Sequence, residues 1–448
     1  MTDTLFDLTG HLIAAAKKAG ADAADAIAVQ SASLSADVLN GVLEHVERSE
    51  ALDIGLRVFV GQRQANISAG KGDAATLEDM AARAVAMARE APQDAAVGLA
   101  DPEQLTRDTD ATALELADSG AAPDAATLET DARRAEAAAA MIDGVSQVQS
   151  ASAGYSRSDI ALAATNGFAA RYARTSRSVS AVAITGEGTG MERDYAGESR
   201  VFAADLPSPE QVGTQAGERT IARAGARKPP TGPAPVLFDE RISGTLIGHL
   251  LAAVDGAAVV RGGTWARELL DQPVLPDALT LTETPHRPRI GQSRLFDAEG
   301  LATVDRKIID AGVLTGWTLD LSTGRKLGMP STANASRGTG GAPFPMVGNL
   351  TLTPGDATRA DLIRDMGTGL LVTSLIGASI NPTTGDYSRG ASGFWVEGGK
   401  VQYPVNECTI AGNLRDMLRS LIAADDGRPE LSRVIPSLLV TGLTIAGA

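Results

Sequence analysis

The stretch Arg227–Pro235, "RKPPTGPAP", divides the chain. It carries four prolines within nine residues. Because proline lacks a backbone N–H and has a fixed φ, such a run continues neither a helix nor a central strand. A chain of 448 residues is also long for a single hydrophobic core. We therefore expect an N-terminal domain at 1–226, a linker at 227–235 and a C-terminal domain at 236–448.

The half before this stretch mixes helical and strand-like segments. Apolar periodicity and capping residues predict helices at about 4–18, 73–92, 124–143 and 208–226. Strand-like segments occupy about 25–39, 51–63, 64–70 and several short runs between 145 and 199, with a hairpin turn expected at Gly61-Gln62. The residues between 93 and 123 are rich in Ala, Asp and Pro, which is typical of a surface connection. This half is predicted to be an α/β-type domain with an antiparallel sheet.

The half after this stretch is expected to be rich in β-structure. After one helix, glycines and turn residues recur at regular intervals. "IIDAGVLTGWTLD" and "FWVEGGKVQYPVN" share a strand, an acidic residue, a glycine two positions later and a second strand. Asp310 with Gly312, and Glu397 with Gly399, therefore predict two hairpins with three-residue loops. The fold class expected for the whole chain is α+β.

Composition excludes several classes of function. The net charge is −15, and no basic stripe with interleaved aromatic residues offsets it, so nucleic-acid binding is not expected. No apolar run approaches the length of a membrane span, which is about 18 residues. The first twenty residues resemble an amphipathic helix of the mature fold more than a signal peptide. One cysteine, Cys408, excludes an internal disulfide, and we expect the protein in the cytoplasm.

A histidine in "SGTLIGHLLAAVDG" (243–256) raises the question of a metal site. On a helix, His249 lies away from the apolar stripe formed by Leu246, Ile247, Leu250, Leu251 and Val254. A zinc site on a helix needs a second ligand about one turn away, and no residue there can bind zinc well. The other histidines, His11, His45 and His286, are scattered. His249 is therefore expected to line an interface or a peptide-binding surface, and no metal is expected in this chain.

Three other features could carry chemistry. Cys408 could be a nucleophile with His249 as its base, although it also fits a small structural residue of a strand. "RGTGGAP", which begins at Arg337, could cradle an anion but equally fits a mobile loop. "NPTTGDYSRG" places Asn381, Asp386 and Arg389 in a loop between strands, where polar residues can line a site or simply make the turn. The residues alone provide no complete catalytic set.

Several stretches resemble the TldE, or PmbA, branch of the TldD/PmbA family. They are "GLRVFVGQRQA" (55–65), "TNGF" (165–168), "GMERDY" (190–195), "GNLTLTPGD" (348–356), "PSLLVTGLTIAG" (436–447) and, above all, the long block at 369–414 that begins "GLLVTSLIGASINPTTGDYSRG". The likeness therefore covers nearly the whole chain. It implies a pairing in which the TldD branch is the metallopeptidase subunit and carries a helix with His-Glu-x-x-x-His, whereas the TldE branch is its partner.

In this sequence the corresponding helix keeps only His249 of that motif. Leu250 stands where the family has its acid, and Ala253 or Val254 stands where it has the second histidine. The resemblance thus implies that zinc is held by a TldD-type partner. It also implies a complex that acts on small unfolded peptides, such as peptide precursors and labile antitoxins. Self-association into a homodimer is expected when the partner is missing.

Two alternatives to a non-catalytic subunit remain at this point. The chain could be an independent hydrolase that uses Cys408 and His249. It could also be a regulator that binds other proteins without catalysing a reaction, as in the family's older description as a modulator of DNA gyrase.

Overall fold

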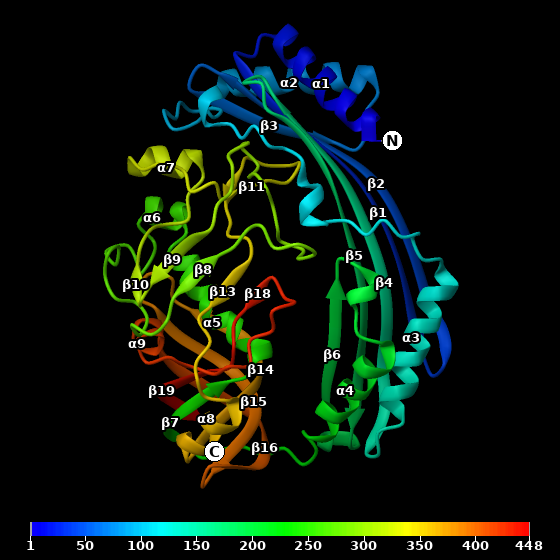
Figure 1. The fold of residues 1–448 in the computed structure, drawn as a ribbon, viewed down its shortest axis with the longest axis vertical. Coiled ribbons are helices and arrows are strands. Elements are labelled where there is room, and N and C mark those ends of the chain that lie inside the picture. Colours follow the sequence, from blue (N-terminus) through cyan, green and yellow to red (C-terminus); the bar gives the residue numbers. More distant parts are fainter. Residues whose placement is uncertain (1, 448) are drawn as a thin grey trace.

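The computed structural model describes residues 2–447, which form two halves that lie side by side (Figure 1). The N-terminal half is one long, curved sheet with four helices, and the C-terminal half is built from shorter strands. In the N-terminal half, the helices are α1 (Thr2–Ala19), α2 (Ala74–Glu90), α3 (Ala125–Ala140) and α4 (Pro209–Ile221), and the strands are β1 (Ala23–Leu39), β2 (Val42–Val60), β3 (Arg63–Ala69), β4 (Val145–Ala164), β5 (Ala169–Thr185) and β6 (Glu192–Arg200).

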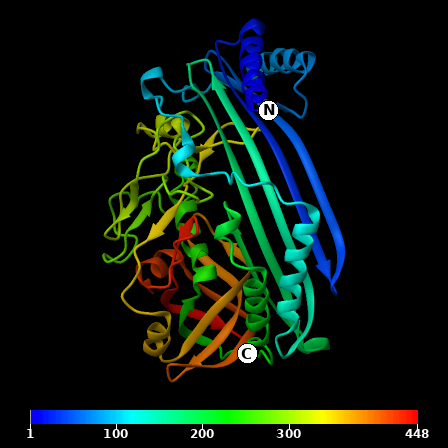
Figure 2. The same ribbon diagram turned by 45° about the vertical axis from the view of Figure 1, so that its right-hand side comes forward.

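The long sheet has the order β3-β2-β1-β4-β5-β6, and all neighbouring strands are antiparallel. Its helices pack in two pairs, α1 with α2 over one end and α3 with α4 over the other, as Figures 1 and 2 show. Next to the C-terminal half, Phe168 and Tyr172 meet the ring of Phe296 edge to face, with centroids 5.4 and 5.9 Å apart. The expected antiparallel sheet with helices is confirmed.

Short polar side chains determine where the helices begin. Asp73 precedes α2 and accepts a hydrogen bond from the Thr76 backbone N–H at 3.1 Å. Asp124 does the same for Thr127 at the start of α3, at 2.8 Å. Each carboxylate satisfies an N–H group that has no partner within the helix, which typically stabilises it by about 1 kcal/mol.

The first half of β2 has an unusual environment. All ten residues from 42 to 51 are exposed, and β3 pairs with β2 only from Ile54 onward. The sequence predicted this strand only from Ala51, because residues that are exposed on both faces leave no apolar alternation to detect. The strand instead begins at Val42.

In the C-terminal half, one sheet closes on itself. Its order is β16-β15-β14-β7-β19-β17, and β16 also pairs with β19. The closing pairs are Thr409 with Ala446, Ile410 with Ile445 and Ala411 with Thr444. The strands are β7 (Gly232–Phe238), β14 (Gly369–Ile380), β15 (Asp386–Glu397), β16 (Lys400–Asn413), β17 (Ile422–Ala423) and β19 (Leu438–Ala446).

The remaining elements surround this closed sheet. A second sheet has the order β10-β9-β8-β13-β18, and the two sheets share one large core with the helix α5. The elements are α5 (Glu240–Ala253), α6 (Gly256–Arg261), α7 (Leu321–Leu327), α8 (Arg359–Met366), α9 (Leu414–Arg419), β8 (Leu281–Glu283), β9 (Arg306–Asp310), β10 (Val313–Leu314), β11 (Ala335–Ser336), β12 (Phe344–Pro345), β13 (Leu350–Leu352) and β18 (Arg433–Val434). The β-rich character expected for this half is confirmed.

The proline-rich stretch ends inside a strand. β7 begins at Gly232, within the expected linker, and includes Pro233 and Pro235. β14 pairs with β7 only from Val236 to Phe238, so the prolines occupy the part of β7 that has one neighbour, β19. Proline is tolerated there because its missing N–H removes no bond to a second strand.

The two predicted hairpins exist, but their loops are one residue shorter than expected. Asp310 pairs with Val313, and Glu397 pairs with Lys400, so each loop has two residues. Both residues of each loop have positive φ, at 43° and 80° for Ala311-Gly312 and at 60° and 70° for Gly398-Gly399. Positive φ at both positions is the geometry of a type I′ turn, which matches the twist of the strands.

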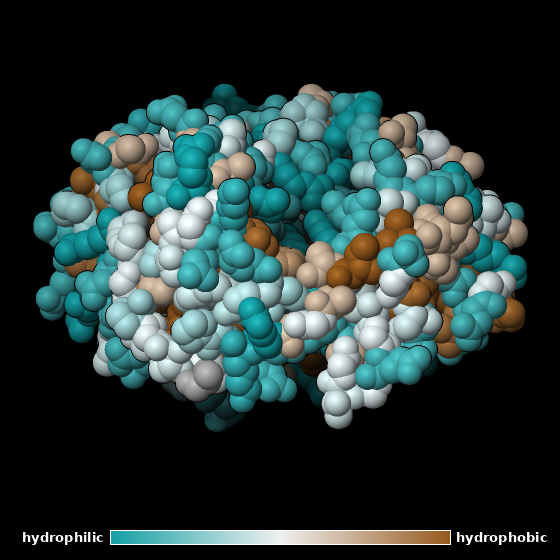
Figure 3. Space-filling model, turned by 90° about the horizontal axis from the view of Figure 1, so that it is seen from below, coloured by the Kyte–Doolittle hydropathy of each residue, from teal (hydrophilic) through white to brown (hydrophobic). Residues whose placement is uncertain are grey.

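Seen from below, the molecule is hollowed near its centre, and hydrophilic residues surround much of the hollow (Figure 3). Among the helices of residues 2–447, none has the length and apolar character needed to cross a membrane.

Candidate functional site

The helix α5 places His249 outside its buried apolar stripe, in a half-buried position. Asp239 caps the helix, and the apolar stripe predicted from the sequence is buried. The ring of His249 meets the ring of Tyr387 on β15 edge to face, at 5.8 Å between centroids. Burial, and then the charge of Arg389, lower the pKa of His249, which favours a neutral imidazole at neutral pH. Within the described chain, the buried atoms His249 Nε2 and Tyr387 Oη have no hydrogen-bond partner.

The surroundings of His249 do not fit a zinc ion. Leu250, Ala253 and Val254, the positions that could supply a neighbouring acid or a second histidine, are at most 5% exposed and face the core. Over residues 2–447 no group of three or more His, Cys, Asp and Glu side chains is placed to hold a metal ion. Zinc sites in proteins use three or four such ligands, so the residues present here do not provide one.

The loop "NPTTGDYSRG", for which the sequence leaves open a site or a turn, begins with a tight turn. Asn381 Oδ1 accepts a hydrogen bond from the Thr384 backbone N–H at 3.2 Å, and Asp386 accepts one from the Thr384 hydroxyl at 2.6 Å. Arg389 points elsewhere and donates from Nε to the Gly377 carbonyl at 2.6 Å. Arg389 lies close enough to His249 for its charge to act on the imidazole. Asn381 and Asp386 instead accept the hydrogen bonds that stabilise the turn.

Arg337 lies between the two halves of the molecule. Its guanidinium forms an ion pair with Asp25 on β1, and Asp25 also accepts from Arg57 Nε on β2 at 2.9 Å. Burial opposes ionisation of Asp25, but the two arginines outweigh it and hold the pKa of this carboxyl below its usual value. The loop that begins at Arg337 is thus packed against the N-terminal sheet, and its arginine is engaged by protein.

The same loop presses closely on β2. A Cβ atom added at Gly55 would lie 2.2 Å from the carbonyl oxygen of Thr339, which is far inside van der Waals contact. Only glycine leaves room for a backbone at this position. Together with the Asp25–Arg337 pair, this contact anchors the C-terminal half on the N-terminal sheet.

Cys408 lies in the core of the C-terminal half. It is 4% exposed, and its Sγ donates to the Ala391 carbonyl at 3.2 Å. Burial raises the pKa of the Cys408 thiol to about 11. A nucleophilic cysteine needs the opposite, a lowered pKa in an accessible and electropositive place. This environment disfavours the hydrolase alternative.

Two buried acids were not anticipated from the sequence. Asp297 and Glu299 are 2% and 8% exposed and lie in the C-terminal half, and Glu299 is near Arg57 of β2. Burial and the charge of Asp297 raise the pKa of Glu299 to about 8, and burial raises the pKa of Asp297 to about 6. Glu299 Oε2 accepts from the Leu321 backbone N–H at 2.8 Å. Alternating acids in "FDAEG" give no sign of burial, because the residues that surround them are distant in sequence.

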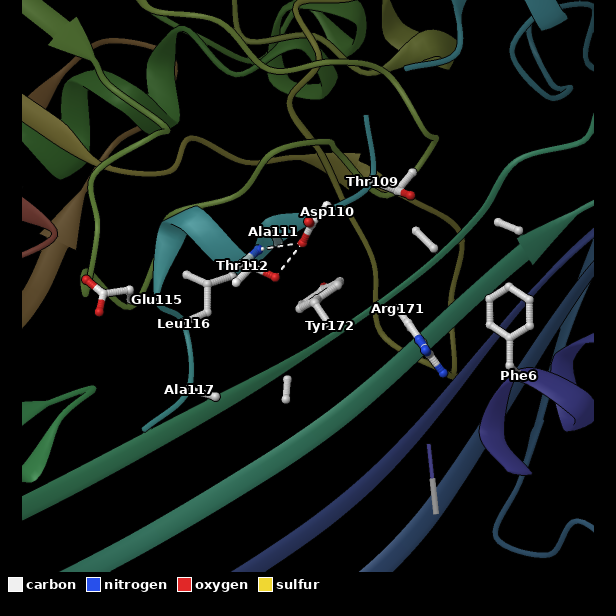
Figure 4. Close-up of a pocket in the computed structure, with 13 residues that line it drawn as sticks. Phe6, Thr109, Asp110, Ala111, Thr112, Glu115, Leu116, Ala117, Arg171 and Tyr172 are labelled. Carbon is white, nitrogen blue, oxygen red and sulfur yellow. Dashed lines mark hydrogen bonds between the residues drawn. The ribbon is translucent and has the colours of Figure 1, made fainter. Parts of the chain in front are cut away.

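The sequence also gave no sign of a cleft beside β5. It has a volume of about 580 Å³. One wall is β5, and the other is the strap, which we define as residues 105–124 between the 3₁₀ turn Pro102–Gln104 and α3. Figure 4 shows Tyr172 pointing from β5 toward the 3₁₀ turn Ala111–Leu114 of the strap. The lining consists of Phe6, strap residues Thr109, Asp110, Ala111, Thr112, Glu115, Leu116 and Ala117, and β5 residues Ala169, Ala170, Arg171, Tyr172 and Ala173.

Comparison with known proteins places the chain in a class of metallopeptidase-family proteins. Three family models match in succession: PmbA/TldA metallopeptidase domain 1 over residues 24–88, the central domain over 108–224 and the C-terminal domain over 231–447. The metalloprotease PmbA of Escherichia coli O157:H7 is 34% identical over 95% of this chain and 92% of its own length. The PmbA homolog of Haemophilus influenzae is 35% identical over 96% of this chain and 94% of its own.

Solved structures agree on the fold. A protein of Bacteroides thetaiotaomicron, described as a proposed modulator of DNA gyrase, is 28% identical, with a TM-score of 0.90 over 99% of this chain and 98% of that chain. TldE of Thermococcus kodakarensis is 18% identical and shares the fold, with a TM-score of 0.84 over 98% of this chain and 100% of that one. The chain belongs to the PmbA/TldD family of metallopeptidases, and it fits the TldE/PmbA branch.

Proposed function

We propose that this chain is the non-catalytic subunit of a two-chain metallopeptidase. Its partner would be a TldD-type subunit that holds the zinc, and the complex would cleave small unfolded peptides in the cytoplasm, among them peptide precursors and labile antitoxins. The observation that carries this proposal is on α5, where His249 stands alone and Leu250, Ala253 and Val254 face the core. A family member with this helix cannot complete a zinc site by itself.

A subunit without metal still has a physical role in such a complex. A peptidase must keep folded proteins away from its metal, and a second subunit can enclose the site so that only an extended chain enters. Because the partner would share this fold, two copies of this chain could also associate when the partner is missing. A permanent interface of this kind is expected to be large and more apolar than ordinary surface.

The test is reconstitution. This chain would be mixed with an intact TldD-type partner, and separately with a partner whose metal-binding histidines are replaced, and cleavage of an unfolded peptide would be measured. Activity should require the partner's histidines and should persist when this chain carries His249→Ala. Cleavage by this chain alone, after contaminating protease has been excluded, would overturn the proposal.

A further inference from the structure

The edge of β5 is open along the cleft. β6 pairs with β5 only from Arg177 to Thr185, so residues 169–176 of β5 have β4 on one side and no strand of the sheet on the other. We call this segment the open edge. Backbone N–H and C=O groups at such an edge can pair with an added extended chain.

The direction of the backbone groups along this edge follows from one hydrogen bond to the strap. Thr175 donates its backbone N–H to the Leu116 carbonyl at 3.1 Å, on the side away from β4. In an antiparallel strand, residues two apart direct their backbone groups to the same side, and this part of β5 has no bulge. Ala169 and Ala173 therefore direct theirs into the cleft, where the described part of the chain offers them no backbone partner.

The strap shows how an occupant would lie. At Leu116 the strap approaches β5 as a pairing strand does. From Leu116 back toward Thr109 the strap is separated from β5 by the cleft. At Ala173, the next alanine along this edge, no residue of the described chain pairs with the backbone on the side of the cleft. From Ala169 to Ala173 the strand rises about 13 Å, at about 3.3 Å per residue, which corresponds to a segment of about four residues.

The side chains of the cleft suit an occupant that is recognised through its main chain. Ala169 and Ala173 are small, so they allow a backbone to come close and read little of its sequence. Tyr172 and Leu116 supply apolar surface, and Asp110 places a carboxylate at the exposed turn of the strap. An α-helix, about 10 Å across, would not pair with an open edge, whereas an extended chain lies about 4.8 Å from its neighbour.

We infer that this cleft binds an extended peptide segment, which adds to β5 as a short strand through the backbone groups of Ala169 and Ala173. The inference deepens the proposed function and rests on it for its biological meaning, because it assigns to this chain a place that holds unfolded peptide. The binding itself requires neither the zinc nor the partner subunit.

The experiment measures binding to this chain alone. A short, capped, fluorescein-labelled peptide of alternating valine and threonine would be titrated with the protein and followed by fluorescence anisotropy. The same peptide with alternate nitrogens methylated lacks the N–H groups that pair with the edge. The methylated peptide should bind at least about tenfold more weakly. Equal binding of the two peptides would overturn the inference.

Variants locate the site. Ala173→Pro removes an N–H that points into the cleft without removing a bond to β4, and it should weaken binding by about tenfold. Ala173→Ser keeps the N–H and should bind within about twofold of the parent protein. If Ala173→Pro does not fold, Ala111→Trp decides, because it fills the cleft from the strap and should abolish binding. Unchanged binding in Ala111→Trp would place the peptide elsewhere and refute the inference. An inactive reconstituted complex with intact peptide binding would instead count against the proposed function alone.

Discussion

Asp25 and Arg337 form an ion pair although 312 positions separate them in the sequence. Their side chains are 9% and 1% exposed, so the pair is buried where the two halves of the molecule meet. Arg57 lies against the same carboxylate. One acid therefore pairs with two arginines, one from each half of the molecule.

Replacement of this acid should be costly. Asp25→Asn leaves Arg57 and Arg337 buried without the carboxylate that pairs with both, and we expect a loss of about 3–5 kcal/mol in the free energy of unfolding. Urea denaturation measures it. The matched control is Glu50→Gln, which removes the acid of the exposed Arg48–Glu50 pair and should cost less than about 1 kcal/mol. Equal costs for the two variants would contradict a central role for Asp25.

A second prediction concerns the close contact at Gly55. Gly55→Ala places a methyl group against the Thr339 carbonyl, so the loop must shift, at an expected cost of about 1–3 kcal/mol. Gly10→Ala is the control, because no atom lies within 4 Å of its added Cβ and α1 should gain helix propensity. The two variants should change the urea midpoint in opposite directions. An unchanged or raised midpoint in Gly55→Ala would show that Gly55 is not needed for close approach.

A third prediction concerns pH. The pKa of Glu299 rises on folding from 4.5 to about 8, so the folded protein binds this proton more tightly than the unfolded chain does. The resulting stability is fully present below about pH 4.5 and is lost as the pH rises through about 8. Glu299→Gln keeps the acceptor for Leu321 and removes the titration. The difference in unfolding free energy, variant minus parent, should therefore increase from about pH 5 to about pH 8 by at most about 1.4 kcal/mol per unit.

The charge of Asp297 is one cause of the raised pKa of Glu299, so the comparison reports the titration of the two acids together. A difference that stays constant with pH would show that Glu299 is ionised in the folded protein across this range.

A fourth prediction concerns metal. The purified chain should hold no stoichiometric zinc, because His249 has no neighbouring ligands. Elemental analysis of the parent, of His249→Ala and of the control His286→Ala should give the same low zinc content. About one zinc per chain that disappears only in His249→Ala would refute this prediction.

A fifth prediction concerns the single thiol. Since Cys408 is buried with a pKa raised to about 11, iodoacetamide should modify it slowly in the folded protein and rapidly in urea. Cys408→Ser should leave the peptidase activity of a reconstituted complex nearly unchanged. Fast modification of the folded chain, together with loss of activity in Cys408→Ser, would restore the hydrolase alternative.

What the sequence could predict was local. The stripe of α5, the two hairpins and the helix starts depend on residues a few positions apart, and they are present as expected apart from the shorter loops. The exposed half of β2 escaped prediction because both of its faces meet solvent. Periodicity reports burial on one face, and this segment has none.

The site residues were harder to predict because their partners are distant. The glycine-rich loop that begins at Arg337 suggests an anion cradle, yet the guanidinium of Arg337 pairs with Asp25 in the other half of the molecule. Asp297 and Glu299 look like ordinary surface acids until the loops around them are placed. The cleft beside β5 exists only because β6 is shorter than β5, and no local pattern specifies the relative lengths of two strands.

The closure of the C-terminal sheet has a consequence for synthesis on the ribosome. Phe238 of β7 pairs with Leu438 of β19, which lies 200 positions later in the sequence. At about 5–20 residues per second, β7 leaves the ribosome roughly 10–40 s before its partner is made. Val236, Leu237 and Phe238 are fully buried in the finished protein. During that interval these side chains, and the edge of β7 that later pairs with β19, are accessible to chaperones and to other nascent chains. Pairing with β19 then covers that edge.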